Sequence, residues 1–184
     1  MTETKHEVFH HSKAGRLDGS FRRLLENPGR ILRGQVKEGM TVLDFGCGPG
    51  YFTLELARLV GDSGKVIAAD LQEEMLQMVK DKTVGTDLEK RIQTHRTSEN
   101  RIGINEQLDY ALAYYVLHET PNQENTLREI YFLLKPGARL YISEPIFEVS
   151  KKEFQEVLET AEKIGYKVIK KPRKLISRDA ILKK

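Results

Sequence analysis

The sequence has one cysteine among its 184 residues, and no apolar run comes near the length of a membrane-spanning helix. A single cysteine excludes an intramolecular disulfide framework and a zinc site built from thiols alone. A spanning helix needs about 20 consecutive apolar residues. The polar stretch Met1–Ser12 also lacks the apolar centre of a signal peptide. We therefore expect a cytoplasmic protein with no disulfide and no membrane span.

The chain also has little excess of one charge over the other, since its formal net charge is only +3. The excess is uneven, because Lys and Arg outnumber Asp and Glu by 11 to 5 from Lys151 to Lys184. Such a segment can attract RNA or an anionic substrate. A solvated helix face and a strand edge protected by lysines explain it as well. We give the second explanation more weight, so a nucleic-acid partner is not our first expectation.

The chain has no repeats and no linker-like segments, and its length suits one domain over residues 1–184. Short β-rich runs alternate with helical patterns, which predicts parallel βαβ units. We expect an α/β fold, a Rossmann-like, doubly wound, seven-stranded sheet that is mostly parallel with a C-terminal antiparallel strand. Residues 41–184 would form this core. Residues 1–40, a helical pattern broken at Asn27-Pro28-Gly29, would form a lid anchored by Leu24, Leu25, Ile31 and Leu32.

The expected strands cover residues 41–45, 65–69, 92–96, 108–114, 139–143, 166–170 and 175–182. The last two would pair as an antiparallel hairpin. Helices are expected at about residues 52–60 and 72–82, after Pro121-Asn122, and after Ser150. Lys135-Pro136-Gly137 would end the third of these helices. Ser150 and Glu153 match a capping box, which is a strong signal for the start of the fourth.

A glycine-rich loop, Asp44-Phe45-Gly46-Cys47-Gly48-Pro49-Gly50, follows the first expected strand. Such a loop faces the ligand site of an open α/β sheet, and glycines let the backbone come close to a ligand. The dinucleotide pattern G-x-G-x-x-G needs a third glycine where this chain has Tyr51, and no Gly-Lys-Ser/Thr follows for a P-loop. The loop alone also fits a tight turn without a ligand.

Asp70 ends the second expected strand, one βαβ step after the loop. A carboxylate at this place can accept both ribose hydroxyl protons of an adenosine group. It can also cap the next helix. Its position relative to the loop favours adenosine binding. NAD and S-adenosylmethionine both carry adenosine, and the glycine spacing favours S-adenosylmethionine.

Together these motifs resemble the class I S-adenosylmethionine-dependent methyltransferases, over roughly residues 35–184. The resemblance is carried by Val42–Gly50, Val66–Asp70, Leu108–Leu112, Leu117-His118, Leu127–Ile130 and Leu134–Leu140. Within the family, the chain looks most like a small-molecule branch related to quinone-biosynthesis C-methyltransferases. The resemblance implies an enzyme that transfers a methyl group from S-adenosylmethionine to a small-molecule acceptor by direct displacement. No metal is expected.

The resemblance also implies a set of cofactor-binding residues at the ends of the first four strands: Asp44, Gly46, Cys47, Gly48, Gly50, Asp70, Leu71, Thr97, Ser98, Glu99, Ala113 and Tyr114. Asp44 and the glycine loop would orient the methionine portion. Asp70 would hold the ribose, and Leu71 would lie against the adenine. Thr97 to Glu99 would contact the adenine edge, although an acidic residue is usual where Thr97 stands. The last two residues of the set would approach the methionine amino group.

His118 is the candidate general base, because it follows the fourth strand on the ligand side and histidine titrates near neutrality. It can equally well pack against the next helix or cap it. The adjacent Glu119 is expected to point elsewhere. His10 and His11, in the expected lid, are second candidates. Tyr114 and its neighbour Tyr115 would either shape the acceptor pocket or pack.

The acceptor site is expected between residues 1–20, the loop after the fourth strand and the loop Glu144–Val149. Cys47 lies inside the cofactor loop, so a cysteine-nucleophile mechanism on a pyrimidine is not expected. Three alternatives remain open: an RNA or protein methyltransferase that uses the basic C-terminal segment, an NAD-linked oxidoreductase, and a non-catalytic S-adenosylmethionine-binding subunit. Neither the acceptor nor the oligomeric state follows from the sequence.

Overall fold

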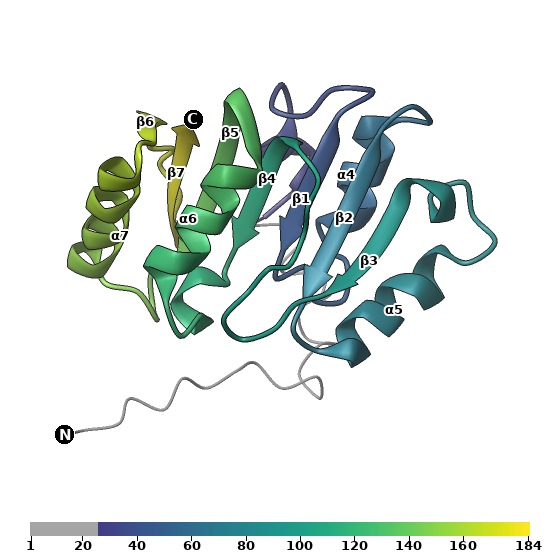
Figure 1. The fold of residues 1–184 in the computed structure, drawn as a ribbon, viewed down its shortest axis with the longest axis horizontal. Coiled ribbons are helices and arrows are strands. Elements are labelled where there is room, and N and C mark those ends of the chain that lie inside the picture. The colour runs from purple at the N-terminus through teal and green to yellow at the C-terminus, as the bar shows by residue number, and fades with distance from the viewer. Residues whose placement is uncertain (1–25) are drawn as a thin grey trace.

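The computed structural model describes residues 26–184, which contain one seven-stranded sheet in the order β3-β2-β1-β4-β5-β7-β6 (Figure 1). The strands are β1 (Thr41–Phe45), β2 (Lys65–Asp70), β3 (Ile92–Arg96), β4 (Leu108–Tyr114), β5 (Leu134–Pro145), β6 (Lys167–Lys170) and β7 (Ser177–Lys183). The helices are α3 (Pro28–Leu32), α4 (Thr53–Val60), α5 (Glu73–Thr83), α6 (Gln123–Leu133) and α7 (Lys151–Ile164), with 3-10 turns η2 (Glu89–Arg91) and η3 (Leu117–Glu119). The expected α/β class and the seven strands are confirmed.

The first five strands are parallel, and β1 lies between β2 and β4. The chain first builds outward from β1 through β2 to β3 and then returns to add β4 on the other side of β1. The strand order therefore reverses between β1 and β4. Open α/β sheets bind their ligands outside the carboxyl ends of the strands at such a reversal.

The C-terminal part closes the sheet with two antiparallel pairings, because β7 pairs with both β5 and β6. The expected antiparallel hairpin is thus confirmed, although its strands start at Lys167 and Ser177, later than predicted. The expected capping box at the start of α7 is also confirmed. The Ser150 hydroxyl accepts the Glu153 N–H at 3.2 Å, and the Glu153 carboxylate accepts the Ser150 N–H at 2.7 Å.

Asn27-Pro28-Gly29, where a break was expected, starts α3, since the Asn27 side chain accepts the Arg30 N–H at 3.0 Å and proline suits a first helical turn. The part of the chain before this break lies outside residues 26–184. One local prediction was wrong. Lys135-Pro136-Gly137 does not separate helix from strand. α6 has already ended at Leu133, and the tripeptide lies inside β5.

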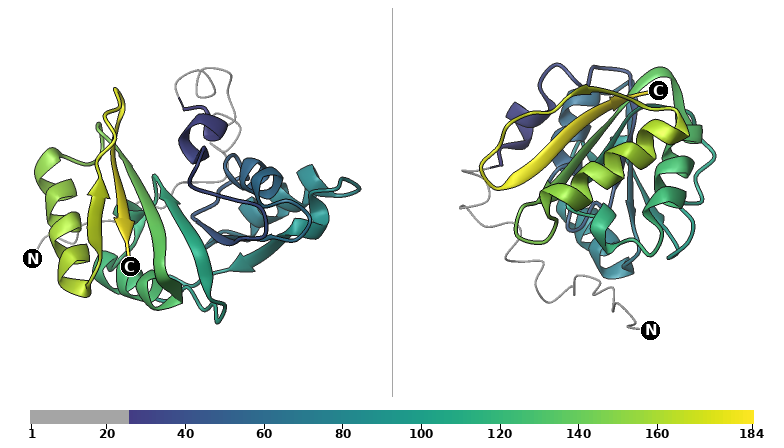
Figure 2. Two further views of the ribbon diagram at one scale, coloured as in Figure 1. Left: turned by 90° about the horizontal axis from the view of Figure 1, so that it is seen from above. Right: turned by 90° about the vertical axis from the view of Figure 1, so that its left-hand side faces the viewer.

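Alternate residues of the parallel strands pack on opposite faces of the sheet. Leu43 of β1 belongs to the apolar cluster under α6 and α7, whereas Val42 packs with α3 and α4, so helices cover both faces (Figure 2). The expected anchors Leu32 and Ile31 join the second cluster, while Leu24, Leu25 and most of the expected lid lie outside residues 26–184. Among the described residues, no helix is both long and apolar enough to cross a membrane.

Candidate functional site

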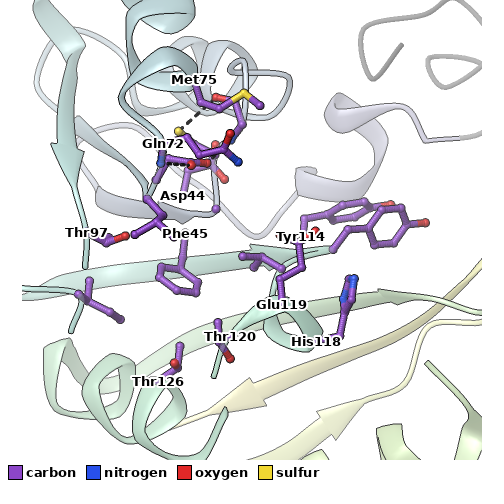
Figure 3. A pocket seen from close by; sticks show the side chains of 18 of the residues that line it. Asp44, Phe45, Gln72, Met75, Thr97, Tyr114, His118, Glu119, Thr120 and Thr126 are labelled. Carbon is purple, nitrogen blue, oxygen red and sulfur yellow. Dashed lines mark hydrogen bonds between the residues drawn. The ribbon is translucent and has the colours of Figure 1, made fainter. Parts of the chain in front are cut away.

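A pocket of about 210 Å³ opens at the carboxyl ends of β1, β2 and β4, where the strand order reverses (Figure 3). Eleven of the sequence-predicted site residues line it: Asp44, Gly46, Cys47, Gly48, Asp70, Leu71, Thr97, Ser98, Glu99, Tyr114 and His118. Gly50 and Ala113 do not. Gly50 faces Val79 of α5, and Ala113 is fully buried in β4.

The glycine loop is attached to the end of β2 by its own backbone. The N–H groups of Gly46 and Cys47 both donate to the Ala69 carbonyl, at 2.8 and 3.0 Å. Gly46 has φ +68, and a Cβ there would lie 2.3 Å from Cγ2 of Val116. Gly48 has φ +51, and a Cβ there would meet nothing within 4 Å. Residue 46 must therefore be glycine, because the Val116 side chain leaves no room for a Cβ. Residue 48 instead borders open space in the pocket.

Asp70 joins the loop to the adjacent turn. Its side chain is 9% exposed, and its two oxygens accept the Gly48 N–H and the Gln72 N–H, each at 2.9 Å. Burial raises the pKa of this carboxyl, and the backbone donors oppose the rise only in part. The N-cap of α5 is Gln72, so the helix-capping explanation of Asp70 does not apply. A third backbone N–H, that of Leu71, also acts on the carboxylate, and an ionised carboxylate can accept further hydrogen bonds.

Asp44, near the end of β1, and Cys47, within the glycine loop, are buried residues that line the pocket. Asp44 is 2% exposed, and its carboxylate accepts the Thr53 hydroxyl at 2.6 Å. Burial, with the nearby charges of Asp44 and Asp70, raises the pKa of the Cys47 thiol well above its ordinary value. A neutral, buried thiol is a poor nucleophile. The structure therefore agrees with the expectation that Cys47 forms no covalent bond to a substrate.

One wall of the pocket comes from the segment after β3. Thr97 is attached to the end of β2, because its N–H donates to the Asp70 carbonyl at 2.9 Å. Ser98 and Arg101 then close a small turn with mutual backbone hydrogen bonds. Met75 of α5, a buried residue, also lines the pocket.

Three tyrosines that line the pocket, two of them at and after the end of β4, hydrogen-bond to a buried glutamate that is not itself part of the lining. The hydroxyls of Tyr114 and Tyr115 both donate to Glu26, which is 2% exposed, and the Tyr51 hydroxyl donates to the Glu26 carbonyl at 2.9 Å. Burial, together with the charge of Glu26, raises the pKa of both Tyr114 and Tyr115, so their hydroxyls stay protonated. Sequence reasoning missed Glu26, because an isolated glutamate before α3 is typical of a surface residue.

His118 lies in η3 and lines the pocket from the β4 side. Its Nδ1 hydrogen-bonds to Glu144 at the end of β5, and its Nε2 lies 2.8 Å from Glu148. It does not cap α6, whose N-cap is Asn122. Glu119 also lines the pocket, so the expectation that it points elsewhere was wrong. His10 and His11 lie outside the described residues.

The electrostatics of His118 reflect two opposing effects. Burial lowers the pKa of the imidazole, but the hydrogen bond and charge of Glu144, helped by Glu119 and Glu148, raise it by more. Burial in turn raises the pKa of Glu144, while His118 and two backbone N–H groups lower it. A histidine whose pKa lies somewhat above its ordinary value can exchange a proton near neutrality. Within residues 26–184, no cluster of three or more candidate metal ligands occurs.

A family model described as a methyltransferase domain matches residues 36–177. The chain belongs to this family, and the methyltransferase resemblance of its sequence is confirmed.

Individual proteins that this chain resembles are methyltransferases as well. A solved S-adenosylmethionine-dependent methyltransferase from Aquifex aeolicus is 29% identical, with a TM-score of 0.86 over 96% of this chain and 99% of that one. A demethylmenaquinone methyltransferase from Lactobacillus johnsonii is 35% identical over 111 residues, 60% of this chain and 46% of its own length. A ubiquinone/menaquinone biosynthesis C-methyltransferase from Cronobacter sakazakii is 27% identical over 146 residues, 79% of this chain and 57% of its own. The chain thus spans about half the length of these two curated relatives.

Proposed function

We propose that this protein transfers a methyl group from S-adenosylmethionine to a small-molecule acceptor. The observation that carries the proposal is the joint placement of Asp70 and the glycine loop. The carboxylate of Asp70 ends β2, accepts the Gly48 N–H at 2.9 Å and lines the same pocket as the loop. The acidic side chain suits the ribose hydroxyls of an adenosine group, and the glycine loop lets the backbone come close to the sulfur-bearing portion of the same ligand.

The lining residues suggest where each portion of the methyl donor binds. Asp70 would accept the two ribose hydroxyls, and Leu71 would lie against the adenine. The Thr97 to Glu99 wall would contact the adenine edge, with the Thr97 hydroxyl in place of an acidic residue. Asp44 and the loop would orient the methionine portion, with Tyr114 near its amino group. Gly50 and Ala113 would support this arrangement from behind, because they do not line the pocket.

The bound donor supplies a methyl group on a positively charged sulfur, which is an excellent leaving group. The chain therefore needs mainly to align the acceptor and to exclude water. Where the acceptor must lose a proton, His118 is the residue we propose as general base. The acceptor would enter beside the residues after β4 and β5, where His118, Glu119 and Glu148 line the pocket. The lid formed by the N-terminal segment remains part of this proposal.

A methyl-transfer screen tests the proposal. The full chain is incubated with methyl-labelled S-adenosylmethionine and a cell extract separated into small-molecule, RNA and protein fractions. We expect label in the small-molecule fraction and much less with the Asp70→Ala variant. Label in the RNA fraction, weakening steeply with salt, would favour the basic segment as a nucleic-acid surface. Donor binding without transfer to any fraction would identify a non-catalytic subunit. A cytoplasmic location is also proposed, and cell fractionation tests it.

A further inference from the structure

His118 is held at both ring nitrogens by carboxylates of very different character. Glu144, on Nδ1, is 1% exposed, whereas the Glu148 side chain, on Nε2, is 62% exposed. Both carboxylates come from the end of β5 or the turn that follows it. One is part of the core and the other borders solvent. The two contacts therefore differ in how easily they can be broken.

Glu144 cannot easily leave its position. One of its oxygens contacts Nδ1 of His118, and the other accepts the Leu117 N–H at 3.0 Å. The pairing of β4 with β5 fixes the strand ends that carry these groups, with Tyr114 opposite Ser143. A carboxylate is an acceptor only, so Nδ1 must carry a proton to bond to it. In the neutral ring, that leaves the lone pair on Nε2.

We infer that Glu144 is a positioning residue that fixes the neutral His118 ring as the Nδ1–H tautomer, and that Glu148 contacts Nε2 only in the protonated ring, so that it gives way to the methyl acceptor when Nε2 loses its proton. This inference rests on the proposed function and specifies how its base is prepared. Nε2 lies 2.8 Å from Glu148, and both His118, labelled in Figure 3, and Glu148 line the pocket. An acceptor group that binds there replaces an exposed carboxylate and meets a basic nitrogen.

The arrangement requires an acceptor atom whose proton must be removed. In the transfer step, the acceptor proton moves to Nε2, and the freed electron pair forms the new bond to the methyl carbon. The carbon–sulfur bond breaks, and its electron pair stays on sulfur. The positive charge thus passes from the sulfonium to the imidazolium of His118. Glu144 stabilises that new charge without moving.

The same contacts set the pH dependence of the base. The acidic groups that act on His118 are Glu119, Glu144 and Glu148, and together they raise its pKa although burial lowers it. The ring accepts a proton only in its neutral form, so activity rises as pH increases through this pKa. Removing the Glu148 charge should lower the pKa. The acid limb of the activity profile would then move to lower pH.

Nitrogen NMR of the histidine rings tests the inference in the full chain, with and without S-adenosylmethionine. The chain has five histidines, and a His118→Gln spectrum assigns the signals of this one. Above its pKa, wild-type His118 should be the Nδ1–H tautomer. Glu144→Gln should convert it to the Nε2–H tautomer, because the Leu117 N–H holds the amide oxygen and turns the amide NH₂ toward Nδ1. Glu148→Gln should lower the pKa and keep Nδ1–H.

Glu124→Gln is the matched control, because this exposed glutamate forms an ion pair with Arg128 and should leave the His118 signals unchanged. An Nε2–H tautomer in the wild type would overturn the inference even if Glu144→Gln failed to fold. A folded Glu144→Gln that keeps Nδ1–H would also overturn it. Neither result bears on the proposed function, which donor binding tests separately.

Kinetics with an acceptor from the screen give a second readout. Glu144→Gln should reduce kcat by about 10²-fold or more, the scale of general base catalysis, with the KM for S-adenosylmethionine unchanged. A rise in that KM with unchanged kcat would show a merely structural role.

Discussion

The hydrogen bond between Thr53 and Asp44 gives the clearest quantitative prediction. It joins the first turn of α4 to the end of β1 directly under the glycine loop. Both side chains are buried, at 0% and 2% exposure, and the oxygens are 2.6 Å apart. Thr53→Val keeps the shape of the side chain and removes only the hydroxyl donor. Asp44 would then remain buried with one partner fewer.

The cost follows from the charge on the acceptor. A hydrogen bond to a charged group contributes about 1.5–3 kcal/mol, compared with about 1 kcal/mol for a neutral pair. In a domain of this size, each 1 kcal/mol changes Tm by about 2–4 °C. We therefore expect Thr53→Val to lose about 1.5–3 kcal/mol of unfolding free energy, and to lower Tm by about 3–12 °C.

Urea unfolding followed by circular dichroism measures this loss. Thr83→Val is the matched control, because Thr83 is also buried but its hydroxyl donates only to carbonyls of its own helix. Those carbonyls also take part in helical hydrogen bonding, so the control should lose clearly less stability. Equal losses in the two variants would refute the argument that the charge of Asp44 makes the Thr53 bond strong.

Two further predictions concern the loop and the base. Gly46→Ala should lose about 2–5 kcal/mol from left-handed strain and from a Cβ 2.3 Å from Val116, whereas Gly48→Ala, with nothing within 4 Å, should lose only about 1–2 kcal/mol. Equal losses in unfolding experiments would contradict the Val116 contact. Because the pKa of His118 is raised above 6.5, its stabilising contribution is full below pH 6.5 and is lost as pH rises through the folded pKa. The difference in unfolding free energy between wild type and His118→Gln should therefore shrink with increasing pH, and a growing difference would contradict the carboxylate contacts.

The side of the pocket that we propose for the cofactor could be predicted because its signals are local. The glycine loop and Asp70 each follow a strand with clear apolar character, and a parallel βαβ unit must place those two strand ends side by side. The loop spacing then distinguished between ligands. Gly50 and Ala113 were assigned by resemblance alone, and both lie behind the residues that line the pocket.

The acceptor side could be predicted only in part, because its contacts join residues that are distant in the sequence. His118 meets Glu144 only through the pairing of β4 with β5, and the loop after the fifth strand was predicted without a role for this carboxylate. Glu26 is 88 residues from Tyr114, its hydrogen-bond partner. The sequence does not distinguish a buried glutamate from an exposed one, because burial depends on elements that are distant along the chain.

Calorimetric titration with S-adenosylmethionine tests the central claim most directly. The full chain should bind the donor at one site and should bind NADH far more weakly. Asp70→Ala should weaken donor binding by about 1.5–3 kcal/mol, the scale of hydrogen bonds to a charged group. The exposed Asp87→Ala should leave donor binding unchanged. Tight NADH binding without donor binding, or a folded Asp70→Ala with wild-type affinity, would contradict the account.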